Sequence, residues 1–146
     1  MEKIYSQIKP NTLLHVINRR EEINSQRQNL SPENEYLQVA CFSAAKDKKL
    51  ASHKHVGQIR TTDITQESWL IIKGSIKITL YDLHDEIIKE TILSQGDCLI
   101  TFRGGHDYIV LEEDTIIYEY KIGPYKGKGS DTTPIDSKNK NINNYS

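Results

Sequence analysis

The chain has 146 residues, of which 36% are hydrophobic and 27% are charged, as expected for one ordinary globular domain. Its 19 basic and 20 acidic residues leave a formal net charge of −1, so no strong field of one sign favours nucleic acid or an anionic membrane as a partner. No apolar run approaches the roughly 20 residues that span a bilayer. The N-terminal sequence also lacks the apolar core of a secretory signal, so we expect a cytoplasmic protein.

Short strands are predicted along most of the chain, because runs rich in Ile, Leu, Val, Tyr and Thr alternate with Gly- and Asp-containing breakers. In chain order, the predicted strands span residues 13–18, 36–44, 68–73, 75–81, 86–93, 98–102, 108–112 and 115–122. The polar stretch 19–29 is expected to form a short helix or an irregular loop. Many short strands at close spacing predict an all-β sandwich or barrel rather than βαβ units.

The composition changes at residue 126. The sequence KGKGSDTTPIDSKNKNINNYS, residues 126–146, is rich in Gly, Ser, Asn, Lys and Asp and cannot bury enough apolar surface to offset its ordering entropy. We therefore predict a single domain over residues 1–125 and a flexible tail over 126–146. Cys41 and Cys98 lie in strand-like apolar runs and are expected to be buried free thiols.

Three separated fragments carry residues that suit a metal site. In the sequence HKH, residues 53–55, the side chains of His53 and His55 would point to the same face of a strand. Glu67 begins the sequence ESWLIIKG, and the sequence GDCLITFRGGH ends at His106. The glycines of the last fragment permit positive φ angles and a tight backbone approach. Imidazole and carboxylate donors together suit a divalent transition metal.

These fragments resemble the two motifs of the cupin superfamily, over roughly residues 36–122. His53, His55, Glu67 and Gly74 match the first motif, and Gly96, Gly104 and His106 match the second. The resemblance implies a double-stranded β-helix, which is a form of jelly roll. It also implies one divalent metal ion, Zn, Mn, Fe or Ni, on His53, His55, Glu67 and His106.

The sequence departs from the cupin motifs in its spacing. Eleven residues separate His55 from Glu67, where the family has three or four, and these residues are expected to form a loop or hairpin at the barrel mouth. Gln58 or Gln66 is therefore an alternative to Glu67 as the fourth ligand.

Further candidate site residues flank these motifs. Arg60 and Arg103 could hold a carboxylate or phosphate, or they could be solvated surface side chains. Glu119 and Lys121 share one face of the last predicted strand, where they could act as acid–base groups or form an outward pair. Tyr108 could be a general acid or a tyrosine at the edge of the core.

The resemblance favours a small metal-dependent enzyme, similar to short cupins associated with bacterial surface-polysaccharide synthesis. We expect an isomerase or epimerase acting on a sugar, sugar phosphate or similar polar metabolite. Two alternatives stay open: a non-catalytic, metal-dependent module that binds a small ligand, and an iron dioxygenase. A homodimer is expected, because strands such as WLIIK and TIIYEY carry apolar residues on both faces.

Overall fold

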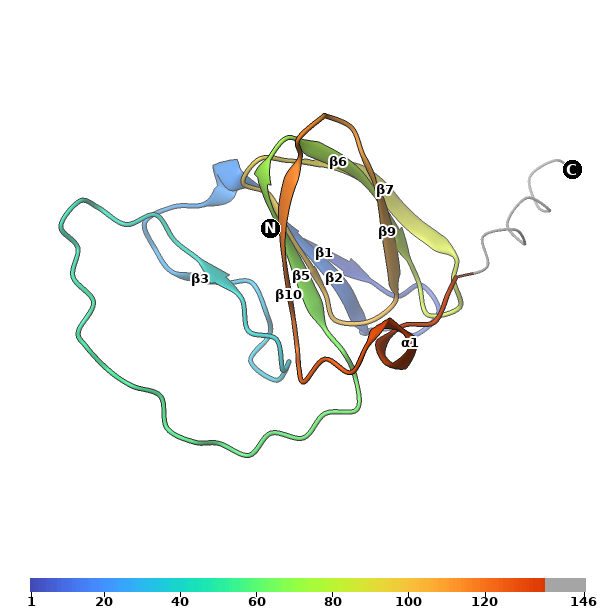
Figure 1. The fold of residues 1–146 in the computed structure, drawn as a ribbon, viewed down its shortest axis with the longest axis horizontal. Helices are drawn as coiled ribbons and strands as arrows, with labels where there is room; N and C mark the ends of the chain where they lie inside the picture. The colour runs from blue at the N-terminus through green and yellow to red at the C-terminus, as the bar shows by residue number, and fades with distance from the viewer. Residues whose placement is uncertain (136–146) are drawn as a thin grey trace, which may run out of the picture.

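The computed structural model describes residues 1–135, and two antiparallel sheets face one another across its core (Figure 1). The larger sheet has the order β1-β2-β8-β5-β10, and the smaller has the order β7-β6-β9. The larger sheet consists of β1 (Glu2–Tyr5), β2 (Leu13–Asn18), β8 (Cys98–Thr101), β5 (Glu67–Lys73) and β10 (Ile116–Lys121). The smaller consists of β7 (Ile87–Ser94), β6 (Ser75–Tyr81) and β9 (Gly105–Val110). The prediction of an all-β fold is confirmed.

The main hydrophobic core lies between the two sheets. Alternate residues of each strand point inward, as the two-residue repeat of a strand requires. The larger sheet supplies Ile17, Trp69, Ile71 and Leu99, and the smaller sheet supplies Ile76, Ile78, Leu80 and Leu93. Because these strands bury one face in common, a slip of one residue would expose the whole set, and the register is strongly specified.

A second apolar cluster covers the outer face of the larger sheet. Leu13, Val16, Ile100 and Phe102 pack there against Leu30, with Leu37, Val39, Cys41 and Cys98 at the margin. The covering residues Leu30, Leu37 and Val39 come from the connection between the two short paired strands β3 (Gln28–Asn29) and β4 (Ala40–Cys41), and Cys41 comes from β4 itself. Both cysteines are free and half-buried, and burial raises the pKa of each thiol.

The structure differs from the predicted elements in four places. The strand predicted over residues 108–112 is β9, which begins earlier, at Gly105, and ends at Val110. The predicted strand 36–44 is reduced to β4, because its only strand partner among residues 1–135 is the two-residue β3. The stretch 19–29 forms a 3-10 turn, Arg20–Glu22, followed by β3. β1 was not predicted, since the sequence EKIY has too little apolar character to be recognised without its partner β2.

The C-terminal part of the described chain is not a plain coil. Residues Lys128–Asp131 form the short helix α1, and residues 131–135 lie at one end of the sandwich. The predicted flexibility of residues 136–146 lies outside the described residues. No helix in residues 1–135 is long and apolar enough to cross a membrane.

Candidate functional site

A cleft of about 770 Å³ opens at one end of the sandwich. Its lining comes from both sheets and from the C-terminal segment, and includes Glu67, Thr101, Arg103, His106, Lys121 and Asp131. The cleft therefore joins residues that are up to 71 positions apart in the sequence, from Ile64 to Ile135.

Strand register explains why these side chains meet. Lys121 pairs with Glu67, Glu67 pairs with Thr101, and Thr101 pairs with His15, which makes one row across β10, β5, β8 and β2. Residues opposite one another in antiparallel strands point to the same face. In the smaller sheet, His106 pairs with Leu80, whose side chain belongs to the core between the sheets. His106 therefore faces the row from the opposite sheet.

Glu67 lies at the centre of the charged contacts. Its Oε1 atom is 2.8 Å from Nε2 of His106, and its Oε2 atom is 3.5 Å from Nζ of Lys121. Burial opposes ionisation of Glu67, but the contacts with His106 and Lys121 outweigh it and lower the pKa of this carboxyl group. The pKa of Lys121 is raised, chiefly by its hydrogen bond to Glu119, whose Oε1 lies 3.0 Å away. Lys121 is therefore a cation at neutral pH.

Two residues that line the cleft each have a buried polar atom without a hydrogen-bond partner. These atoms are Nδ1 of His106 and Oδ2 of Asp131. With Glu67 accepting a hydrogen bond from Nε2, the ring proton is assigned to Nε2 and Nδ1 carries the lone pair. The ring packs edge-on against Trp69, with centroids 4.7 Å apart. Unsatisfied buried polar atoms are rare in folded proteins and often mark the place of a ligand, ion or water.

Behind the cleft, His15 is fully buried. Its Nδ1 lies 3.1 Å from Oγ1 of Thr101, and its Nε2 lies 3.3 Å from the carbonyl oxygen of Tyr81. Burial lowers the pKa of His15 to about 4, so the ring is neutral at physiological pH. Gly104 passes close by with φ of 78°, and a Cβ atom there would lie 2.4 Å from the Tyr81 carbonyl oxygen. The predicted positive φ of this glycine is confirmed.

Arg103 lines the cleft and is anchored from outside it. Its Nη1 atom lies 2.6 Å from Oε1 of Glu35, a side chain that is almost fully buried. Glu35 also accepts a hydrogen bond from Nε2 of Gln66, and Oε1 of Gln66 accepts one from the backbone N–H of Leu37. Gln66, the alternative metal ligand, is thus already engaged in this network.

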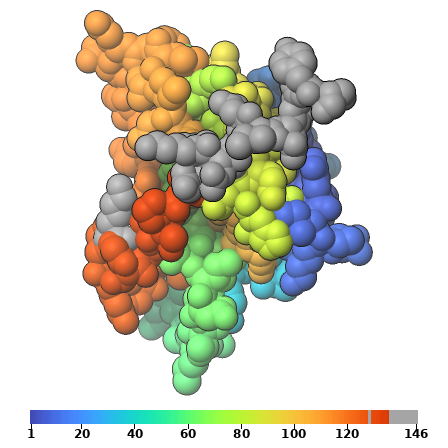
Figure 2. All heavy atoms as spheres, turned by 90° about the vertical axis from the view of Figure 1, so that its right-hand side faces the viewer, coloured from blue at the N-terminus to red at the C-terminus, as the bar shows by residue number. Residues whose placement is uncertain are grey.

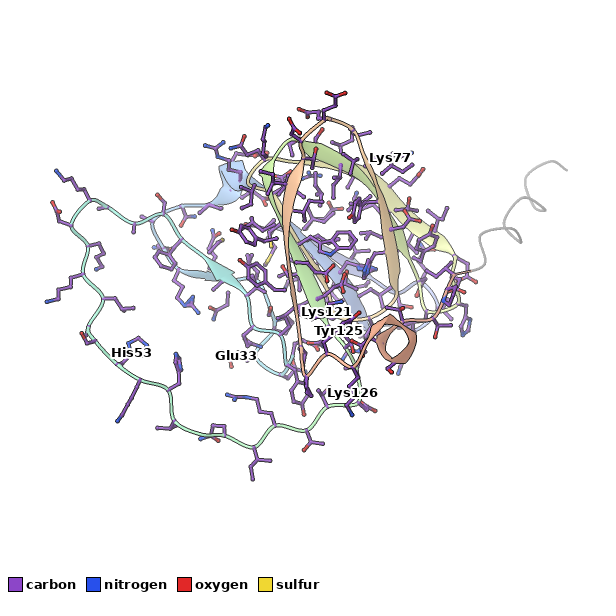
Figure 3. All side chains as sticks on the ribbon, viewed as in Figure 1. Glu33, His53, Lys77, Lys121, Tyr125 and Lys126 are labelled. Atoms are coloured by element: carbon purple, nitrogen blue, oxygen red, sulfur yellow. The ribbon has the colours of Figure 1, made fainter. Side chains whose placement is uncertain are left out.

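The structure brings together two of the four predicted metal ligands. Glu67 and His106 meet in the cleft, whereas His53 and His55 lie on the segment 42–66, where every residue from 42 to 61 is exposed. Arg60 and Gln58 lie on the same segment. Figure 3 shows His53 on this outer loop, well away from Lys121. Within residues 1–135, no cluster of three or more His, Cys, Asp or Glu side chains lies close enough to hold a metal ion.

The remaining predicted residues lie beside the cleft rather than in its lining. Glu119 accepts a hydrogen bond from Nε1 of Trp69, over 3.3 Å, and is half exposed. The ring of Tyr108 packs edge-on against the same Trp69, with centroids 5.0 Å apart. Glu119 pairs with Trp69, and Tyr108 pairs with Ile78. Each side chain therefore shares the inner face of its sheet with a residue of the core.

Sequence reasoning missed several parts of the site. A lone histidine in the strand LLHVIN gives no sign that His15 lies behind the cleft. Tyr81 donates a hydrogen bond to Oδ2 of Asp107 over 2.5 Å, and both residues line the cleft. Burial and this carboxylate raise the pKa of Tyr81 to about 12. Residues 131–135 were predicted as part of a tail, yet they line the cleft, and Ile135 lies directly against Gly105.

Comparisons with protein-family models, curated proteins and solved structures found no match for this chain. The case for a function therefore rests on the geometry of the cleft and on the sequence motifs.

Proposed function

We propose that the two sheets form a double-stranded β-helix of the cupin type, and that the protein is a small isomerase or epimerase. Its substrate would be a sugar, a sugar phosphate or a similar polar metabolite, as in surface-polysaccharide synthesis. One observation carries this proposal: Glu67 holds Nε2 of His106 at 2.8 Å, while Nδ1 of the same ring has no partner and belongs to a residue that lines the cleft.

This arrangement suits proton transfer. A carboxylate that binds one imidazole nitrogen fixes the tautomer and leaves the other nitrogen as a base. In the proposed reaction, His106 removes a proton from carbon next to a carbonyl group, and Glu67 orients its ring. The cation of Lys121 stabilises the negative charge that develops on the substrate oxygen. Arg103 binds a phosphate or carboxylate of the substrate at the cleft wall.

The predicted metal ion needs donors beyond those in the cleft. A site with Glu67 and His106 alone falls short of the three or four protein ligands typical of a bound transition metal. The side chains that the cleft brings together do not make up a metal site by themselves, and the proton transfer described above uses only the chain's own groups. Metal binding by His53, His55, Glu67 and His106 stays a prediction that metal analysis can test.

The test is exchange of substrate hydrogen in deuterium oxide. Hexose 6-phosphates and pentose 5-phosphates are incubated with the protein, and deuterium at carbon is followed by NMR. We expect exchange with at least one of these probes, and a loss of about 100-fold or more in Glu67→Gln and His106→Gln. Lys77→Gln, on the outer face of β6, is the matched control and should exchange normally.

Two results would overturn the enzymatic proposal. Binding of a sugar phosphate without any exchange of its hydrogen would favour the alternative, a non-catalytic module that binds a small ligand. Exchange that is unchanged in His106→Gln would remove the imidazole from the reaction.

A further inference from the structure

The segment 42–66 is the most unusual part of the described chain. It joins β4 to β5 through 25 residues without regular secondary structure, whereas loops longer than about 12–15 residues are uncommon inside a compact domain. Figure 1 shows the segment running away from the sheets and back, and Figure 2 shows its green part projecting from the rest of the molecule.

This segment exposes apolar side chains to solvent. Leu50, Val56 and Ile59 are 78%, 75% and 99% exposed. Burying each of them against a partner would stabilise a complex by roughly 1.5–3 kcal/mol. The segment is also strongly basic, since residues 42–61 carry Lys46, Lys48, Lys49, Lys54 and Arg60 against the single acidic Asp47.

A complementary surface lies on β9 and on the connection from β9 to β10. Both strands are terminal strands of their sheets in the described chain, and they do not pair with each other. The backbone groups along the outer edge of β9 are thus unpaired, and Ile109 on this strand is 66% exposed. The connection between the two strands is acidic, with Glu112, Glu113 and Asp114 all exposed.

We propose that the segment 46–59 of one chain docks on the β9 edge of a second copy as an added antiparallel strand. This direction places Lys46, Lys48 and Lys49 beside the acidic connection 112–114, and the chain from Leu50 onward runs along β9 toward Gly105. Strand addition to a free edge is a recurrent mode of recognition, in which main-chain hydrogen bonds supply affinity. With two-fold symmetry each copy gives one segment and receives one, which doubles the contact.

The occupant is a second copy because this chain itself carries both the basic stretch 46–49 and the acidic connection 112–114, so two copies complement one another. In Figure 1 the first part of the segment runs outward on the side of β3, away from β9 and from the β9–β10 connection at the top of the view. The proposal goes beyond the chemistry of the cleft and does not depend on it. It also gives a definite contact to the homodimer expected from the sequence.

The decisive experiment is zero-length cross-linking with a carbodiimide in an equal mixture of ¹⁴N- and ¹⁵N-labelled full-length chains. We expect cross-links between Lys46–Lys49 and Glu112–Asp114 that join a light peptide to a heavy one. Cross-links only between peptides of the same label would show docking within one chain and overturn the proposal, as would their absence. Sedimentation of the untreated protein should show a dimer that weakens as salt is raised.

Two sets of variants distinguish the contribution of charge to dimerisation from that of main-chain hydrogen bonds. Lys48→Glu combined with Lys49→Glu should raise the dimer dissociation constant about tenfold, and adding Glu113→Lys should restore part of the loss. Lys126→Glu, an exposed lysine outside the segment, is the control. Val56→Pro removes a backbone N–H and should abolish dimerisation, whereas Val56→Ile keeps both the N–H and an apolar side chain and should have little effect. Equal effects of Pro and Ile, or no effect of the charge reversal, would contradict strand addition.

Discussion

Glu67 and His106 lie on strands of the two facing sheets and contact one another at 2.8 Å, whereas His53 and His55 lie on a segment that is exposed from residue 42 to residue 61. All four residues were predicted from sequence motifs as ligands of one ion, with Gln58 or Gln66 as an alternative to Glu67. The two pairs differ because one lies on strands, where the register sets the direction of each side chain, and the other lies on a long loop. The contacts of His53 and His55 are local instead: the two rings contact one another, and Nδ1 of His53 lies 3.0 Å from the carbonyl oxygen of Ala51.

The largest expected effect is the difference in unfolding free energy between a core variant and a variant in the segment 42–66. Ile78 is fully buried between the sheets, so Ile78→Ala should lower the free energy of unfolding by about 2–5 kcal/mol, because a cavity is left. Ile59→Ala should change it by less than about 0.5 kcal/mol. Both are measured by urea denaturation at the lowest usable protein concentration, where an oligomer dissociates. A large loss in Ile59→Ala under those conditions would show that the segment is buried within a single protomer.

The next effect concerns His15 behind the cleft. Its pKa is lowered to about 4 in the folded protein, while the unfolded chain has the ordinary value near 6.5. The unfolded state therefore binds the proton first as pH falls, so folding stability should decrease from about pH 6.5 and level off below about pH 4. The contribution of His15 is at most about 3 kcal/mol. Denaturation across this range should show a shallower slope in His15→Gln than in the control His84→Gln, whose ring is exposed.

The smallest expected effect concerns metal binding shared between the loop residues His53 and His55 and the cleft residues Glu67 and His106. If one ion is held by His53, His55, Glu67 and His106, then protein purified without a chelator should contain near-stoichiometric transition metal. His53→Ala combined with His55→Ala should weaken metal affinity by about 10–100-fold or more, and Glu67→Gln should do the same. Elemental analysis and competition with a chelator provide the measurement, with His84→Ala as the control. Equal affinity in the wild type and in the histidine double variant would take the segment out of the metal site.

Much of the fold follows from local sequence. The sequence SIKITLY was predicted as a strand over residues 75–81, and the structure has β6 at these residues, with Ile76 and Ile78 in the core. Gly96 and Gly104 were expected to permit positive φ, and they have φ of 90° and 78°. The common face of Glu119 and Lys121 also follows from the two-residue repeat, and their pairing with Trp69 and Glu67 agrees with it.

The site itself was decided by tertiary structure. Which strands lie side by side, and in which register, depends on contacts between residues far apart in the chain, and only these contacts place Lys121 and Thr101 on either side of Glu67. The same holds for His15, which reaches the back of the cleft because β2 pairs with β8. The sequence by itself determined the all-β class, most of the strands and the turns between them, since these depend on neighbouring residues. The cleft, the contacts of Glu67 and the exposure of residues 42–61 depend on burial and pairing across the whole chain, for which local patterns carry no signal.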